Sequence, residues 1–194
     1  MIFNEKLRQT GENISMGFKM SYPEKVGGLK GEYWVKLYDR QGHLLAERHN
    51  NNIIVNTASV LIARLLKDNS EPSGGITYLA MGTGGVGWDL QNPPQPTTSQ
   101  TILENEIARK AFSTEDVTFI DPDTGNPTIV PTNVVDFTAT FAETEAVGPL
   151  VEMGLFGGDA TDLLDSGTEV NYRTFPVINK TNSMTLTIIF RITA

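Results

Sequence analysis

The sequence of 194 residues contains no cysteine, and this absence excludes several structures and chemistries. Without thiols the chain cannot form disulfides, thiolate nucleophiles, iron–sulfur clusters or cysteine-ligated zinc sites. Its stability must therefore come from packing or from assembly with other chains. Basic residues are also few, since 15 Lys and Arg oppose 23 Asp and Glu and the formal net charge is −8. Such a surface repels phosphate backbones, so we expect no nucleic-acid partner.

Long hydrophobic runs are lacking as well. No apolar stretch approaches the roughly 20 residues that a membrane-spanning helix needs, and the first ten residues lack a basic region followed by an apolar one. We therefore expect no membrane partner and no translocation across a membrane. With 39% hydrophobic and 20% charged residues, the composition suits one globular domain, or one domain plus an arm.

The first 30 residues are predicted to form an extended N-terminal arm. They show no sustained period, yet they scatter large apolar side chains such as Phe3 and Phe18 among polar ones. A frayed terminus is one interpretation. The other is an arm that folds onto a neighbouring subunit and uses these side chains as anchors. The pattern alone leaves both open.

Residues 31–194 read as strands and turns. Apolar side chains alternate over residues 33–38, and a polar turn with Gly42 leads to a second short run at residues 43–49, which predicts a β-hairpin. Residues 134–141 alternate in the same way. Further short strands are predicted at residues 76–81, 107–112, 117–120, 150–156, 173–178 and 184–192. This pattern predicts a mainly β fold, with a β-sandwich or jelly-roll-like domain over residues 31–194.

One short helix interrupts the strands. Asn56 or Thr57 can cap a helix that ends near residues 67–69. Its apolar stripe is Ala58, Leu61, Ile62 and Leu65. An amphipathic helix must bury such a stripe, so we expect it to pack against the sheet. A single helical turn is also predicted over residues 101–106.

A glycine-rich stretch, Gly82 to Gly87, matches the letters of the dinucleotide-binding fingerprint G-x-G-x-x-G. That motif works only where a helix begins at the last glycines and its N-terminal amides hold the pyrophosphate. Here residues 88–96 contain three prolines, which forbid that helix. We therefore predict a turn-rich loop between strands and no nucleotide cofactor.

The sequence offers no catalytic constellation. The only two histidines, His43 and His49, are separated by about 20 Å along a strand at ~3.3 Å per residue, too far to share a metal. No G-x-S-x-G elbow marks a serine nucleophile. Asp121 and Asp123 alternate in a tight turn and could offer oxygen ligands to calcium, but Pro122 favours a rigid exposed turn. We predict no enzyme activity and no cofactor, and calcium at this turn stays open.

Large aromatic residues are the candidates for an interface. Trp34 and Tyr38 share one face of the first strand, while the other face is also apolar. That strand either lies in the middle of a sandwich or offers one face to a partner. Trp88, next to the prolines, is either a lid over the core or a contact residue. The interface candidates are Phe3, Phe18, Trp34, Tyr38 and Trp88.

Several segments, in order, resemble a module common among virion proteins of tailed bacteriophages. They are residues 34–39 with Gly42, residues 52–57 leading to 61–66, residues 78–84, residues 103–110, and residues 137–141 with 152–157. The ending, residues 173–181 followed by 186–188, is similar to that family too. The resemblance covers about residues 31–194 and leaves out the arm.

The resemblance implies a non-enzymatic β-rich building block that works as a symmetric oligomer, often a trimer. Similar modules decorate capsids or belong to tails and fibres. This sequence has no collagen-like repeat and no heptads, which favours a stand-alone oligomer over a fibre. We expect a capsid cement or decoration protein, a homotrimer made in the host cytoplasm that binds the major capsid protein on the virion. A tail, baseplate or fibre-attachment component, partnered by tail proteins, is one alternative, and a carbohydrate-binding β-sandwich using Trp88 is another.

Overall fold

The computed structural model describes residues 28–67 and 74–194. Phe3, Phe18 and nearly all of the predicted arm lie outside the described residues. Within them the chain is mainly β, as predicted, with one α-helix, α2 (Asn56–Lys67). The strands are β1 (Lys30–Asp39), β2 (Leu44–Ile54), β3 (Gly74–Gly82), β4 (Glu106–Ala111), β5 (Val117–Ile120), β6 (Pro127–Thr128), β7 (Val134–Phe141), β8 (Gly148–Gly158), β9 (Thr168–Lys180) and β10 (Met184–Thr193). No helix in this part of the chain is long and apolar enough to cross a membrane.

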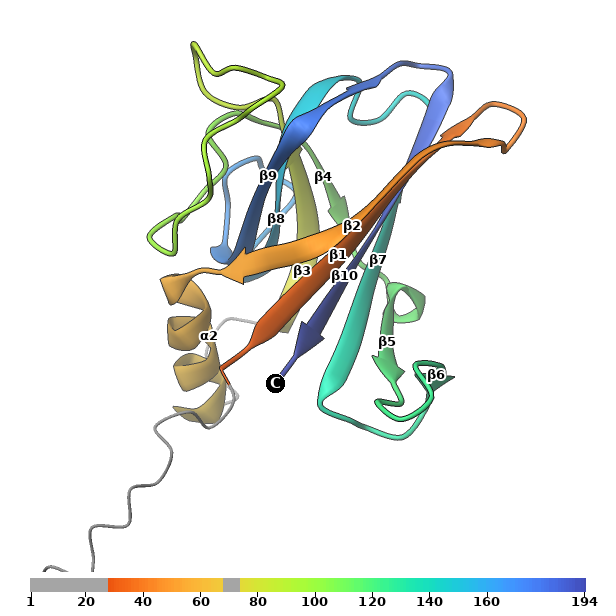
Figure 1. Cartoon of the computed structure of the whole chain (residues 1–194). Coiled ribbons are helices and arrows are strands. Elements are labelled where there is room, and N and C mark those ends of the chain that lie inside the picture. Colours follow the sequence, from red (N-terminus) through yellow and green to blue (C-terminus); the bar gives the residue numbers. More distant parts are fainter. Residues whose placement is uncertain (1–27, 68–73) are drawn as a thin grey trace, which may run out of the picture.

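The strands form one antiparallel sheet in the order β4-β3-β8-β9-β2-β1-β10-β7-β5-β6. The join between its two halves is narrow. Strand β2 pairs with β1 along most of its length, but only Ile53 and Ile54 pair with β9. The sheet bends at this join, so the first half (β2, β1, β10, β7) faces the second half (β9, β8, β3, β4), as Figure 1 shows.

The main core lies between the two halves. Alternation decides which side chains enter it: Tyr33, Val35 and Leu37 of β1 are buried, while their neighbours along the strand are only half-buried. The paired strands align their own inward residues in rows, for example Leu37 with Leu186. One continuous cluster then joins the inward residues of both halves, with Leu79, Met81, Met153 and Leu155 from the second half.

The second half of the sheet is buried on both faces. Its outer face is covered by the long loop of residues 83–105, whose Leu103 packs against Ala80, Phe156 and Tyr172 in a separate cluster. This explains why β8 reads as a nearly continuous apolar run and not as an alternating strand. The loop is the turn-rich connection that the prolines predicted.

The helix α2 packs against β9 beside the join. Ala58 and Leu61 are buried, as predicted, and the Thr57 hydroxyl donates a 2.5 Å hydrogen bond to the Glu169 carbonyl of β9. Thr57 thus fastens the helix to the sheet. The rest of the predicted apolar stripe is different, because Ile62 and Leu65 are 39% and 42% exposed. Half of the stripe is therefore open to solvent.

The helical turn predicted over residues 101–106 is absent, and this segment contains bends that lead into β4. The physical reason lies in its backbone donors. The N–H groups of Glu104 and Asn105 bond to the side chain of Glu152 on β8. The Glu152 carboxylate thus accepts hydrogen bonds from the backbone N–H groups that a helical turn would have used.

Candidate functional site

Trp34 lies on the outer face of the first half, where its ring contacts one side chain from each of the two neighbouring strands. The His49 ring of β2 stacks on it at 4.3 Å between centroids, tilted by 6°, and the Arg191 guanidinium lies 5.2 Å from its centre. Arg191 is held in place by two hydrogen bonds to Asp136, 2.7 and 2.9 Å long. Tyr38 shares this outer face and is half-buried. Trp34 therefore belongs to a row of side chains that contact one another across β2, β1, β10 and β7.

Trp88 lies against the glycine-rich stretch. A Cβ atom on Gly84 would lie 2.5 Å from the indole ring, and one on Gly85 would lie 2.7 Å from its Nε1. The glycines therefore let the tryptophan lie directly on the backbone. Gly84 and Gly85, which lie in the stretch that matches G-x-G-x-x-G, therefore serve the packing of Trp88. The indole also lines a polar hollow of about 280 Å³ whose other walls include Gln100, Glu104 and Tyr172.

The Asp121 turn is closed by its own side chain. The Asp121 carboxylate accepts hydrogen bonds from the backbone N–H groups of Asp123 (2.9 Å) and Thr124 (3.4 Å), and these bonds lower its pKa. Gly125 completes the turn with a φ of 71°. Across residues 28–67 and 74–194, no three His, Cys, Asp or Glu side chains are placed to share a metal ion.

Three buried glutamates on the outer face of the second half were not predicted from the sequence. We call these three residues (Glu106, Glu152 and Glu169) the acid cluster. The Glu152 side chain has no exposed surface. Its Oε1 accepts hydrogen bonds from the N–H groups of Gly84 (3.0 Å) and Asn105 (2.9 Å). Its Oε2 accepts bonds from the Glu104 N–H (3.0 Å) and the Tyr172 hydroxyl (2.7 Å). One carboxylate thus ties both ends of the covering loop to β8.

Glu106 forms a buried ion pair with Arg109 on β4. The two bonds of this fork are 2.6 and 2.7 Å long, and both side chains are almost fully buried. Arg109 also donates to the carbonyl and the hydroxyl of Ser166, and its guanidinium lies over the rings of Tyr78 and Phe156. The pair therefore holds the loop after β8 against the sheet.

Glu169 differs from the other two because neither carboxylate oxygen has a hydrogen-bond partner among the described residues. The side chain is fully buried, and a Cβ on Gly154 would lie 2.8 Å from its Oε1. Burial, and then the nearby charges of Glu152 and Glu106, raise the pKa of Glu169 to about 9. Burial and Glu152 also raise the pKa of Tyr172. Glu169 is therefore neutral at pH 7.

The acid cluster left a signal in the sequence. Glu152 interrupts an apolar run that spans residues 150–156, and a charged residue in such a run needs a buried partner. Three of its four hydrogen-bond donors are backbone N–H groups between residues 84 and 105, which no side-chain motif marks. The cluster is closed under the loop, and two of its three members fasten loops to the sheet. It supports the fold and offers no open surface to a substrate.

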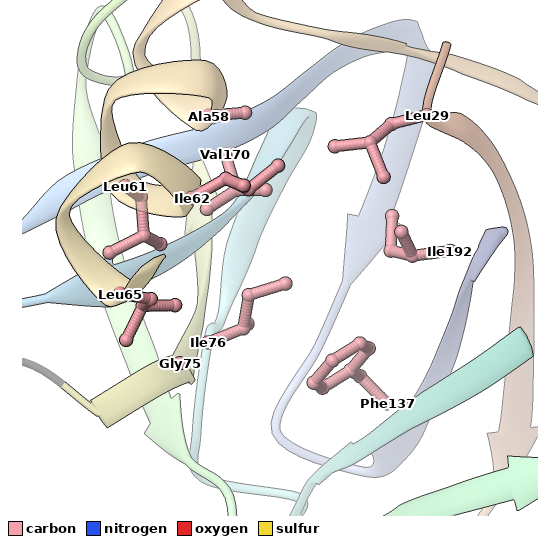
Figure 2. A pocket seen from close by; sticks show the side chains of 10 residues that line it. All are labelled: Leu29, Ala58, Leu61, Ile62, Leu65, Gly75, Ile76, Phe137, Val170 and Ile192. Atoms are coloured by element: carbon pink, nitrogen blue, oxygen red, sulfur yellow. The ribbon is translucent and has the colours of Figure 1, made fainter. Parts of the chain in front are cut away.

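The open hollow lies elsewhere, beside α2. This α2 groove has a volume of about 240 Å³ and is lined by Leu29, Ala58, Leu61, Ile62, Leu65, Gly75, Ile76, Phe137, Val170 and Ile192. Figure 2 shows these side chains converging on one space from the helix, from both halves of the sheet and from the residue just before β1. None of them carries a polar group. Such a groove can bind an apolar side chain or ligand and has no group for chemistry.

Comparisons with known proteins add no assignment to this site. The sequence matches no protein-family model, and it has no significant match among curated proteins. Among the described residues, the α2 groove is the candidate binding site.

Proposed function

We propose that this chain is a non-enzymatic structural protein of a bacteriophage virion, with a role as a capsid cement or decoration protein in a homotrimer. The observation that carries the proposal is the chemical contrast between the closed acid cluster and the open α2 groove. Its buried acids mostly serve the fold, whereas its apolar α2 groove can hold an apolar protein segment. Binding without chemistry is what a structural partner needs. The ordered resemblance over residues 31–194 supports the virion setting.

The mechanism of such a protein is thermodynamic. A decoration protein that binds only the assembled shell stabilises that shell by mass action. Once one subunit of an oligomer is bound, the effective concentration of its other subunits at their sites rises, with no new chemistry. The contact residues that we propose are Phe3, Phe18, Trp34, Tyr38 and Trp88. Of these, Trp34 and Tyr38 share the outer face of β1 and are half-buried, and this face is the contact surface that we propose.

The molar ratio of this chain to the major capsid protein in purified particles tests the proposal. Quantitative mass spectrometry measures it directly. A ratio near one, or a simple fraction of one, supports a cement role on the shell. A few copies per particle would move the protein to the tail, baseplate or fibre attachment. Complete absence from particles would refute the virion proposal.

A second candidate function is carbohydrate binding, and one observation favours it. Trp88 lines a hollow with Gln100, Glu104 and Thr174, which combines an aromatic face with polar groups. Sugars bind to such surfaces by stacking and hydrogen bonding. A glycan array tests this candidate, with the Trp88→Ala variant as its control. Binding that disappears in the variant would support it, and no binding would discard it.

A further inference from the structure

The α2 groove lies where the N-terminal segment joins the folded body. Leu29, the last residue before β1, forms part of its wall. Ile62 and Leu65 on the opposite wall are 39% and 42% exposed. An open cavity with only apolar walls is a poor site for water and a good one for an apolar side chain. Its volume of about 240 Å³ exceeds the ~150 Å³ of an engineered cavity that takes up benzene.

The sequence just before this groove carries side chains that fit it. Met16, Phe18 and Met20 alternate with small or polar residues, so an extended backbone would present all three on one side. They would span about 13 Å at ~3.3 Å per residue. The apolar stripe of α2, from Ala58 to Leu65, spans about 10 Å at 1.5 Å per residue. The two apolar rows therefore match in length.

We propose that residues 16–20 of this chain dock into its own α2 groove, with the Phe18 ring in the hollow and Met16 and Met20 beside it. The connection is long enough. Residues 21–28 reach about 26 Å when extended, which exceeds the ~18 Å length of α2, and Gly27 and Gly28 allow the chain to reverse. A short tether of this kind gives the segment a local concentration near the millimolar range.

A second hollow beside Leu29 supports the same path. It has a volume of about 280 Å³ and includes Gly31 and Asn52 in its wall. Both polar atoms of the Asn52 side chain are buried without a hydrogen-bond partner in the described part of the chain. Leaving a buried amide unpaired is costly. On the proposed docking path, the backbone of residues 21–27 would pass this wall and would offer N–H and C=O groups of the kind that the amide requires.

Cysteine pairs in the full chain test the docking, because the natural sequence contains no cysteine. The test pair is Met16→Cys with Leu65→Cys, and the matched control is Met16→Cys with Val60→Cys. Val60 lies on the same helix, is 56% exposed and is not part of the groove wall. Both pairs have nearly the same tether length. Oxidation of dilute protein, followed by intact mass and a non-reducing gel, measures disulfide formation within one chain.

We expect the groove pair to close within one chain at least about ten times faster than the control pair, because docking adds to the effective concentration of the tether. Adding Phe18→Ala should bring the groove pair down to the control rate, and adding Phe3→Ala should leave it unchanged. Equal rates for the two pairs would overturn the docking. Disulfide-linked dimers in place of closed monomers would also overturn it, in favour of exchange between copies.

In the isolated chain this docking occupies the α2 groove and Phe18, both of which the proposed function offers to a partner, so a partner segment on the particle would have to displace residues 16–20. The docking can fail while the virion proposal holds, and the reverse is equally possible. If Phe18 anchors the base of the arm, the arm leaves the body beside α2. Phe3 then remains as the interface candidate of the arm for a neighbouring subunit.

Discussion

The acid cluster and the α2 groove show two opposite uses of buried space in one molecule. The acid cluster is polar, closed by the loop of residues 83–105 and mostly satisfied, since Glu152 accepts four hydrogen bonds. The groove is apolar, partly exposed and lined by no polar side chain. Burying a polar group costs free energy unless a hydrogen-bond partner is present, whereas apolar walls can be left open at small cost. The first region therefore serves the fold, and the second can serve a partner.

The same contrast appears in the two halves of the sheet. In the first half, β1, β7 and β10 alternate, with buried residues toward the core and charged or aromatic residues such as Trp34 outward, while β2 is largely exposed. The second half is covered on both faces, and its strand β8 is buried almost throughout. A long loop must then be held on the outer face, and the buried Glu152 carboxylate holds it because it accepts several backbone donors at once. The acid cluster is a consequence of this second layer.

Breaking the buried ion pair should have the largest effect on stability. The variant Arg109→Met leaves the Glu106 carboxylate buried without its cation, which costs about 3–5 kcal/mol of unfolding free energy. Urea denaturation followed by circular dichroism measures this loss. The double variant Glu106→Gln with Arg109→Met removes both charges and should recover much of it. A single variant with wild-type stability would show that the pair is not a necessary fastening.

The next effect is expected at Glu152. In Glu152→Gln an amide NH₂ replaces one oxygen, so it must face either the Glu104 N–H or the N–H groups of Gly84 and Asn105. A lost bond and a donor facing a donor cost about 2–3 kcal/mol. The control is Glu143→Gln, which removes only an exposed ion pair with Arg40 and should stay within about 0.5 kcal/mol. Equal losses in the two variants would contradict an anchoring role for Glu152.

Local sequence patterns predicted the elements of the fold, but not the contacts that depend on distant residues. Period 2 over residues 134–141 predicts β7 because its side chains have a core on one side and solvent on the other. The strand positions, the helix and the turn-rich loop after β3 follow from such local patterns and from proline. The helical turn over residues 101–106 was wrong because its donors are used by Glu152, a partner almost 50 positions away.

The candidate site was harder to predict than the strands. The stripe of α2 predicted a buried face, but the groove forms only because the bend at Ile53 and Ile54 brings the helix near β10 and β7. No local pattern encodes that bend. Trp34 and Tyr38 share one face of β1, as predicted, yet the contacts of Trp34 with His49 and Arg191 depend on the register of three strands. Whether the interface candidates bind a partner stays a prediction.

Glu169 should make the stability of the protein fall as the pH rises. Its pKa is about 9 in the folded chain against an ordinary 4.5, so between these values folding takes up one proton. Unfolding free energy then decreases by up to about 1.4 kcal/mol per pH unit over that window, and this contribution is constant below it and above it. The variant Glu169→Gln cannot ionise and should be more stable than wild type by up to roughly 2 kcal/mol at pH 6, with a larger gain at higher pH within that window. Parallel pH profiles of the two proteins would contradict a neutral Glu169.

The smallest effect is expected in the groove, and it separates the two regions most sharply. Leu65 is 42% exposed in the described body, so Leu65→Ala should cost only about 1 kcal/mol of unfolding free energy, and Val60→Ala less. If residues 16–20 fill the groove, part of that cost belongs to Phe18. The loss from Leu65→Ala should then shrink by about 0.5–1 kcal/mol in a Phe18→Ala background, a coupling that a double-mutant cycle resolves. Full additivity would mean that Leu65 serves only the body, and the groove would then be as structural as the acid cluster.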